Sequence, residues 1–192
     1  MAISRPLLAG AVAACLAGCF SPVKDSASQD TVEASAYRRS LAGTTIEDWA
    51  PMAAMSARRL LEQYGAPDEV RPEFMVWRGK DRWQRITAWN IPEPYPQGDD
   101  IGFVEHAVEY PPLTPAQLVN LSAFDSRLMY YGLVQTLAAR SDREEVNILR
   151  LNLADDVLAW RVTPEQARQR YGEILNLEAA GKSSPYMSKL RF

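Results

Sequence analysis

Residues 73–90 read EFMVWRGKDRWQRITAWN, and the fold that the sequence predicts is built on this stretch. Glu73 to Arg78 and Trp83 to Asn90 are rich in aromatic and β-branched side chains, and Gly79 to Arg82 join the two runs. Two such runs with a short, glycine-containing connection indicate a β-hairpin. We therefore expect an antiparallel pair of strands at the centre of the domain.

A helix is expected just before this hairpin, over Pro51 to Tyr64. Its methionine and leucine residues recur at an approximately helical spacing. Gly65 follows where a helix commonly ends in the left-handed conformation, and Pro67 prevents the helix from continuing.

Two further strands are expected after a proline-rich loop at residues 91–98. Phe103 to Tyr110 alternates, with His106 on the face of the valines and Glu105 on the other, which is typical of a half-buried strand. Leu128 to Arg140 is apolar on both faces. It is interpreted as a long central strand with a bulge at Gly132.

Three capping boxes predict the starts of the remaining helices. They are Thr114-Pro-Ala-Gln117, Ser141-Asp-Arg-Glu144 and Thr163-Pro-Glu-Gln166. The second of these helices runs to about Ala159 and is apolar on two sides, so we expect it to be buried on two sides.

These elements predict an α+β fold, with an antiparallel sheet of about four strands and helices packed mainly on one face. Residues 46–178 are expected to form this single domain. Residues 19–45 lack periodicity and are interpreted as a flexible tether, and residues 179–192 as a loose C-terminal tail.

The first residues carry a targeting signal. Arg5 precedes an apolar run of about ten residues, Pro6 to Cys15, which is too short to span a bilayer. Leu16-Ala17-Gly18-Cys19 then resembles the lipobox of bacterial lipoproteins, in which the leader is cut before the cysteine and lipid is added to it. The resemblance implies a signal peptide over 1–18, lipidation of Cys19 and membrane attachment through that lipid. Phe20, in place of aspartate, favours the periplasmic face of the outer membrane.

A second resemblance covers most of the mature chain. The segments that carry it are Ala57 to Glu69, Val76-Trp77, Trp83-x-Arg85, Asn152 to Asp156 and Thr163 to Arg168. Together they resemble a family of uncharacterised bacterial lipoproteins with no known activity. Residues 52–90 are also distantly similar to the SmpA/OmlA (BamE) lipoproteins, which are accessory subunits of outer-membrane protein assembly.

Residues suited to catalysis are few. His106 is the single histidine, and both cysteines lie at or before position 19, so we expect no zinc site and no other cofactor. The expected role of His106 is packing on its strand. The alternative is a periplasmic hydrolase acting on an envelope substrate, with His106 near Glu105, Asp99 or Asp100.

The hairpin carries the candidate binding residues. Period-two alternation predicts Trp83, Arg85, Thr87 and Trp89 on one face of its second strand. Arg78, Lys80 and Arg82 lie around its turn. Arginine with aromatic residues is typical of binding surfaces, and the set also suits anionic lipid headgroups or glycan. The alternative is that the tryptophan face packs under a helix and the charges only solvate a turn.

The expected function is therefore that of a lipid-anchored, non-enzymatic envelope protein that binds a protein or another envelope component. The net charge of −3 argues against a nucleic-acid partner, because nucleic-acid-binding domains are usually basic.

Overall fold

The computed structural model describes residues 26–91 and 102–192, and the side chains from residue 31 onward. The helices and strands follow one another along the chain in this order: α1 (Ser26–Glu47), α2 (Pro51–Tyr64), β1 (Glu69–Val70), β2 (Phe74–Lys80), β3 (Trp83–Trp89), β4 (Val104–Glu109), α3 (Pro115–Phe124), β5 (Met129–Tyr131), the 3₁₀ helix η1 (Gly132–Val134), β6 (Thr136–Ser141), α4 (Glu144–Leu158), α5 (Pro164–Ala179) and α6 (Pro185–Ser188).

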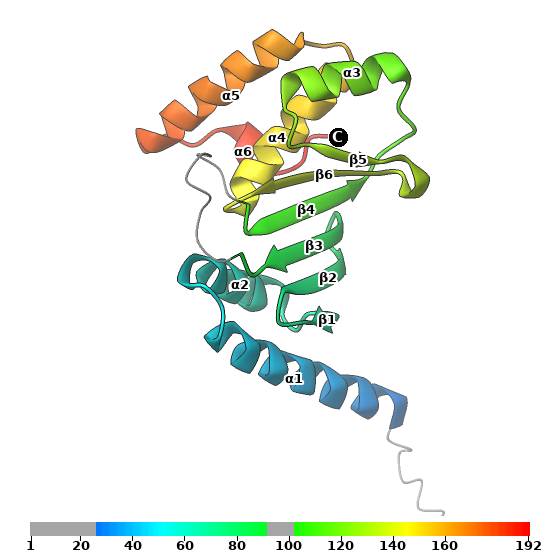
Figure 1. Cartoon of the computed structure of the whole chain (residues 1–192), viewed down its shortest axis with the longest axis vertical. Coiled ribbons are helices and arrows are strands. Elements are labelled where there is room, and N and C mark those ends of the chain that lie inside the picture. The colour runs from blue at the N-terminus through cyan, green and yellow to red at the C-terminus, as the bar shows by residue number, and fades with distance from the viewer. Residues whose placement is uncertain (1–25, 92–101) are drawn as a thin grey trace, which may run out of the picture.

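The strands form one antiparallel sheet in the order β1-β2-β3-β4-β6-β5 (Figure 1). The predicted α+β class is confirmed. The described part of the chain has six strands rather than about four. The additional strands, β1 and β5, are short and lie at the two edges of the sheet, where a short strand limits pairing with other chains.

The central hairpin is confirmed, with a tighter turn than predicted. Lys80 pairs with Trp83, so Asp81 and Arg82 alone make the connection. Gly79 and Asp81 adopt φ angles of 58° and 49°, which place both in the left-handed region. Glycine enters this region without steric cost, and aspartate tolerates it better than most residues.

One face of the sheet lies under α2 and α4. Helix α2 contacts β2 and β3, whereas α4 contacts β4 and β6 (Figure 1). The Asn147 side chain of α4 donates to the Val104 carbonyl at 2.9 Å, and the Trp77 indole donates to the Gly65 carbonyl at 2.9 Å. The large apolar side chains that are fully buried in this core include Trp77, Met75, Ile86, Leu137, Leu149, Leu151 and Leu153.

Strand β4 is buried on both faces, so the predicted half-buried strand is wrong. Glu105, expected to face solvent, is 4% exposed, and Ala107 on the same face is fully buried. The reason is the position of β4 between β3 and β6. Its neighbours carry Arg85 and Arg140, whose long side chains cover the second face of the sheet.

The predicted long strand over 128–140 is also wrong. It is a hairpin in which β5 is an edge strand, β6 is an inner strand, and η1 connects them. Gly132 begins η1 rather than forming a bulge, and Gln135 ends it with a φ of 48°. The apolar run therefore covers two strands with different burial.

The predicted tether is helical where the structure describes it, because α1 covers residues 26–47. Ala42 and Ile46 lie one turn apart on α1, and both are buried in the core. The Arg38 Nε donates to the Pro67 carbonyl at 3.0 Å, which fixes α1 beside the segment that follows α2. Cys15 and Cys19 lie outside the described residues.

The predicted loose tail is docked on the domain. Its short helix α6 packs against α4, and Met187 and Leu190 are buried. The Asn152 Nδ2 donates to the Tyr186 and Lys189 carbonyls, each at 2.9 Å, and its Oδ1 accepts from the Arg191 amide at 2.9 Å. One buried asparagine of α4 therefore binds three backbone groups of the final segment.

Two of the three predicted capping boxes are formed, those of Thr114 and Thr163. The third is wrong, because Arg143 is the N-cap of α4 and makes no side-chain cap. The Ser141 Oγ instead accepts from the Arg143 amide at 3.3 Å, just before the helix begins. Within residues 26–91 and 102–192, no helix combines the length and apolarity needed to cross a bilayer.

Candidate functional site

The second face of the sheet carries a shallow depression with a volume of about 370 Å³. It lies over β1, β2, β3 and β4 and reaches the edge strand β5. We call it the sheet-face depression, and its lining residues are Glu69, Phe74, Val76, Arg78, Arg85, Thr87, Trp89, Glu105 and Tyr131. Such a mixture of aromatic rings, arginines and carboxylates suits recognition of a partner that is partly apolar and partly charged.

The centre of the depression is an ion pair between neighbouring strands. The Arg85 Nη2 lies 2.6 Å from the Glu105 Oε1. The Glu105 side chain is nearly buried, whereas 38% of the Arg85 side chain remains exposed. The Arg85 guanidinium also lies 5.9 Å from the centre of the Tyr131 ring. This arginine therefore neutralises a buried carboxylate and still presents part of its surface to solvent.

A second arginine borders the depression beside Trp89. The Arg140 guanidinium lies 4.9 Å from the Trp89 ring, in cation–π contact, and its Nε donates to the Gly102 carbonyl at 2.7 Å. Burial lowers the pKa of Arg140 below its usual value, although arginine stays protonated in proteins. Arg140 pairs in register with Glu105 across β4 and β6. The buried carboxylate thus has arginines on both sides.

The far side of the depression repeats this arrangement in a more exposed form. Glu69 lies 2.9 Å from Arg78 and 3.3 Å from Arg71. Hydrogen bonds from these two arginines lower the pKa of Glu69. Because the three side chains are accessible to water, this group adds little to stability and is free to exchange its partners.

The structure brings together three of the predicted binding residues, since Arg78, Arg85 and Trp89 all line the depression. Lys80 and Arg82 lie at the β2–β3 turn, and neither lines it.

Trp83 does not share their face, and this part of the prediction is wrong. Its indole donates to the Glu144 carboxylate of α4 at 3.0 Å, and its ring lies 4.5 Å from the His106 ring on the helix-covered face. The left-handed residues Gly79 and Asp81 sharpen the turn, and strict alternation does not extend to the first residue after it.

Five lining residues of the depression are not among the binding residues that the sequence predicts: Glu69, Phe74, Val76, Glu105 and Tyr131. The alternation over 103–110 predicts a solvated face for Glu105, and the apolar run over 128–140 predicts that Tyr131 lies inside a single long strand. A charged residue within a β-branched strand was the available signal for Glu105, because such a residue usually has an ionic partner on a neighbouring strand.

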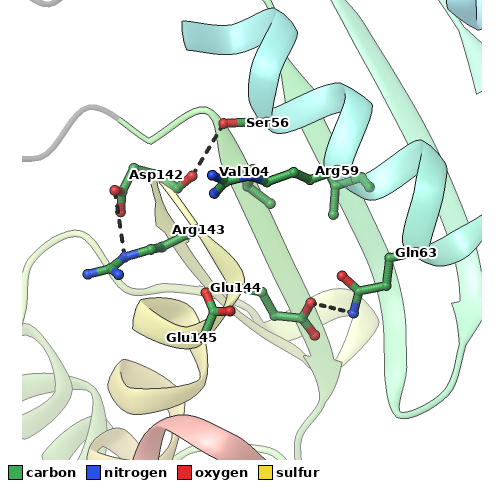
Figure 2. A pocket seen from close by; sticks show the side chains of 9 residues that line it. Ser56, Arg59, Gln63, Val104, Asp142, Arg143, Glu144 and Glu145 are labelled. Atoms are coloured by element: carbon green, nitrogen blue, oxygen red, sulfur yellow. Dashed lines mark hydrogen bonds and ion pairs between the residues drawn. The ribbon is translucent and has the colours of Figure 1, made fainter. Parts of the chain in front are cut away.

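A group of polar side chains surrounds Glu144 at the start of α4. Glu144 accepts from Gln63 Nε2 at 2.9 Å, from the Tyr64 hydroxyl at 2.7 Å and from Trp83 Nε1 at 3.0 Å. Figure 2 shows the Gln63 contact, which joins α2 to α4. Burial and the neighbouring carboxylate raise the pKa of Tyr64, so the hydroxyl stays a donor.

The crevice drawn in Figure 2 lies between α2 and the start of α4 and has a volume of about 70 Å³. Ser56, Arg59 and Glu145 are among its lining residues. A ligand pocket for an organic molecule usually measures roughly 300 Å³ or more. The crevice suits a few ordered water molecules rather than a substrate.

His106 is packed in the core, as its expected role required. It is fully buried, and its Nδ1 lies 2.9 Å from Asn147 Nδ2. Its Nε2 lies 3.9 Å from Glu144, which is beyond hydrogen-bonding distance. Burial lowers the pKa of His106 to about 3, so the ring is neutral at physiological pH.

The residues proposed to act with His106 do not meet it. Glu105 lies on the opposite face of the sheet, in contact with Arg85. Asp99 and Asp100 lie outside the described residues. His106 also lines neither the crevice nor the sheet-face depression. In the part of the chain that the structure describes, no three histidine, cysteine, aspartate or glutamate side chains come together in a way that suits a metal ion.

Comparison with models of known protein families, with curated proteins and with solved structures finds no match for this chain.

Proposed function

We propose that this chain is a lipid-anchored envelope protein without catalytic activity, whose domain binds another envelope protein through the sheet-face depression. The lipobox-like Leu16 to Cys19 supports attachment by lipid at Cys19, and Phe20 in place of aspartate favours the periplasmic face of the outer membrane. In the proposed role, the lipid holds the domain at the membrane and the sheet presents the binding surface.

The observation that carries the binding role is the composition of the depression. It combines three aromatic rings with two arginines that keep exposed surface, Arg78 and Arg85. Aromatic and arginine side chains contribute most of the energy at protein interfaces, because they bury large areas and retain a polar group. The face is also wide and shallow, which suits a protein surface better than a small substrate.

The experiment is in-cell cross-linking of the full chain, followed by purification in mild detergent. The test variant combines Arg78→Ser, Arg85→Ser and Glu105→Gln, so that loss of Arg85 does not leave a buried carboxylate unpaired. The matched control is Arg58→Ser, which removes an exposed arginine of α2.

The proposal predicts that a partner recovered with the wild-type chain and with the Arg58→Ser variant is lost with the triple variant. Equal recovery with all three chains, when circular dichroism shows that all are folded, would contradict it.

A further inference from the structure

The connection between β5 and β6 exposes apolar side chains at its tip. Leu133 is fully exposed, Val134 is 62% exposed and Tyr131 is 40% exposed. We call these three residues the apolar tip. Residues 128–135, which surround it, contain no charged side chain. Isolated apolar residues on a surface are ordinary, whereas a contiguous exposed group at a protrusion indicates a contact site.

The tip is held by its own backbone rather than by packing. The Gln135 amide donates to the Gly132 carbonyl at 3.4 Å, and Gln135 takes the left-handed conformation. The Thr136 hydroxyl donates to the Val134 carbonyl at 3.0 Å. These bonds define a one-turn structure from which Leu133 projects into solvent. Exposure of this apolar side chain to water is unfavourable in free energy.

The tip shares its end of the sheet with the β2–β3 turn. The antiparallel register places Lys80 and Trp83 at the same end of the sheet as Glu109, which ends β4, and Thr136, which follows the β5–β6 connection. Lys80 and Arg82 flank Asp81 in that turn and leave it with a net positive charge. Cationic side chains beside an apolar protrusion match a bilayer surface, with headgroup phosphates above acyl chains.

The side that the tip faces is also the side from which α1 begins. In Figure 1 the β5–β6 connection and the Ser26 end of α1 both project to the right of the view. Cys19 precedes Ser26 by seven positions in the sequence. The tip and the Ser26 end of α1 therefore lie on the same side of the described part of the chain.

We infer that the apolar tip is a second membrane contact, which inserts Leu133 and Val134 into the interfacial region of the bilayer that holds the Cys19 lipid. Tyr131 lies at the base of the tip, and its ring belongs to the sheet-face depression beside Arg85. Lys80 faces the lipid phosphates, and the Arg82 guanidinium lies in the same turn, where it donates to the Phe192 carbonyl. This inference rests on the lipid anchor of the proposed function. The full exposure of Leu133 favours insertion into a bilayer over binding of a peptide.

The test uses the full acylated chain with Leu133→Cys, which would be the single free thiol once the leader is removed and Cys19 is acylated. A polarity-sensitive fluorophore is attached at that thiol, and the chain is reconstituted into vesicles of phosphatidylethanolamine and phosphatidylglycerol. The matched control is Leu177→Cys on α5, which is also a partly exposed leucine and lies toward the end of α5 at the left of Figure 1.

The inference predicts blue-shifted emission and quenching by brominated lipid for the label at position 133, and neither for the label at position 177. In the chain lacking the lipid through Cys19→Ser, Leu133→Asp should lower vesicle affinity by at least about tenfold, since burial of one leucine contributes that much.

Acylation is measured separately, by mass spectrometry of the same preparation. An acylated chain whose label at position 133 behaves like that at position 177 would overturn the second membrane contact and leave the proposed function standing. A chain without acylation would contradict the proposed function itself.

Discussion

Arg85 and Glu105, from the neighbouring strands β3 and β4, form an ion pair with a separation of 2.6 Å, and the carboxylate is almost fully buried. A buried carboxylate without a cation is costly, because it has lost its hydration. Arg85 thus has a structural role in addition to the binding role proposed for it.

The pair makes a quantitative prediction. Arg85→Ala should lower the free energy of unfolding by about 2 kcal/mol, an intermediate value because the arginine remains partly hydrated. Adding Glu105→Gln should restore most of that loss, since the amide carries no charge. Urea denaturation of the single and double variants measures both effects, and additive losses would contradict the ion-pair account.

His106 predicts a dependence of stability on pH. Its pKa is about 3 in the folded chain, below the value of about 6.5 for a free histidine. The unfolded chain therefore binds a proton first as the pH falls, and stability is lost progressively between about pH 6.5 and pH 3.

At pH 5 this contribution should amount to about 2 kcal/mol relative to pH 7. The variant His106→Phe, which keeps a ring beside Trp83, should lack it. NMR of the wild-type chain should find a His106 ring that does not titrate between pH 8 and pH 5. A normal titration near pH 6.5 would show that the ring is accessible to water.

Glu144 is predicted to hold α4 against the hairpin. Glu144→Ala removes the acceptor for the Tyr64 hydroxyl and the Trp83 indole. It should lower the free energy of unfolding by about 2–3 kcal/mol. The control is Glu145→Ala, which removes an exposed carboxylate from the same first turn of α4 and so matches the effect on the helix dipole. Urea unfolding followed by tryptophan fluorescence measures the free energy of unfolding of both variants. An equal decrease in the two variants would refute the role of Glu144.

Asn152 is predicted to hold the C-terminal segment. Asn152→Ala removes three hydrogen bonds to the backbone of that segment. Since each bond contributes roughly 1 kcal/mol, the free energy of unfolding should fall by about 3 kcal/mol. Limited proteolysis should then cut after Lys182 or Lys189 much faster than in the wild-type chain. Asn176→Ala, at an exposed position of α5, should leave the cleavage rate unchanged.

The sequence predicts those structural elements that depend on residues close together in the chain. The hairpin at 73–90 and the caps at Thr114 and Thr163 depend on residues within a few positions of one another, and all three are formed. The α+β class followed from the order of these elements. Ser141 shows the limit of such motifs, because its hydroxyl binds the backbone one turn too early to cap α4.

Features that depend on distant partners were not predictable in this way. The docking of residues 185–192 requires Asn152, and the burial of Glu105 requires Arg85 from a different strand. Trp83 points toward α4, where Glu144 accepts a hydrogen bond from its indole N–H. Each contact joins residues at least 20 positions apart, which pattern and propensity do not relate.

The most direct test of the account is the mass of the N-terminal peptide of the chain purified from bacterial membranes. The account predicts that this peptide begins at Cys19 and carries a diacylglyceryl group on the sulfur. A peptide that retains residues 1–18, or a Cys19 with an unmodified thiol, would contradict the lipid anchor on which the proposed function depends.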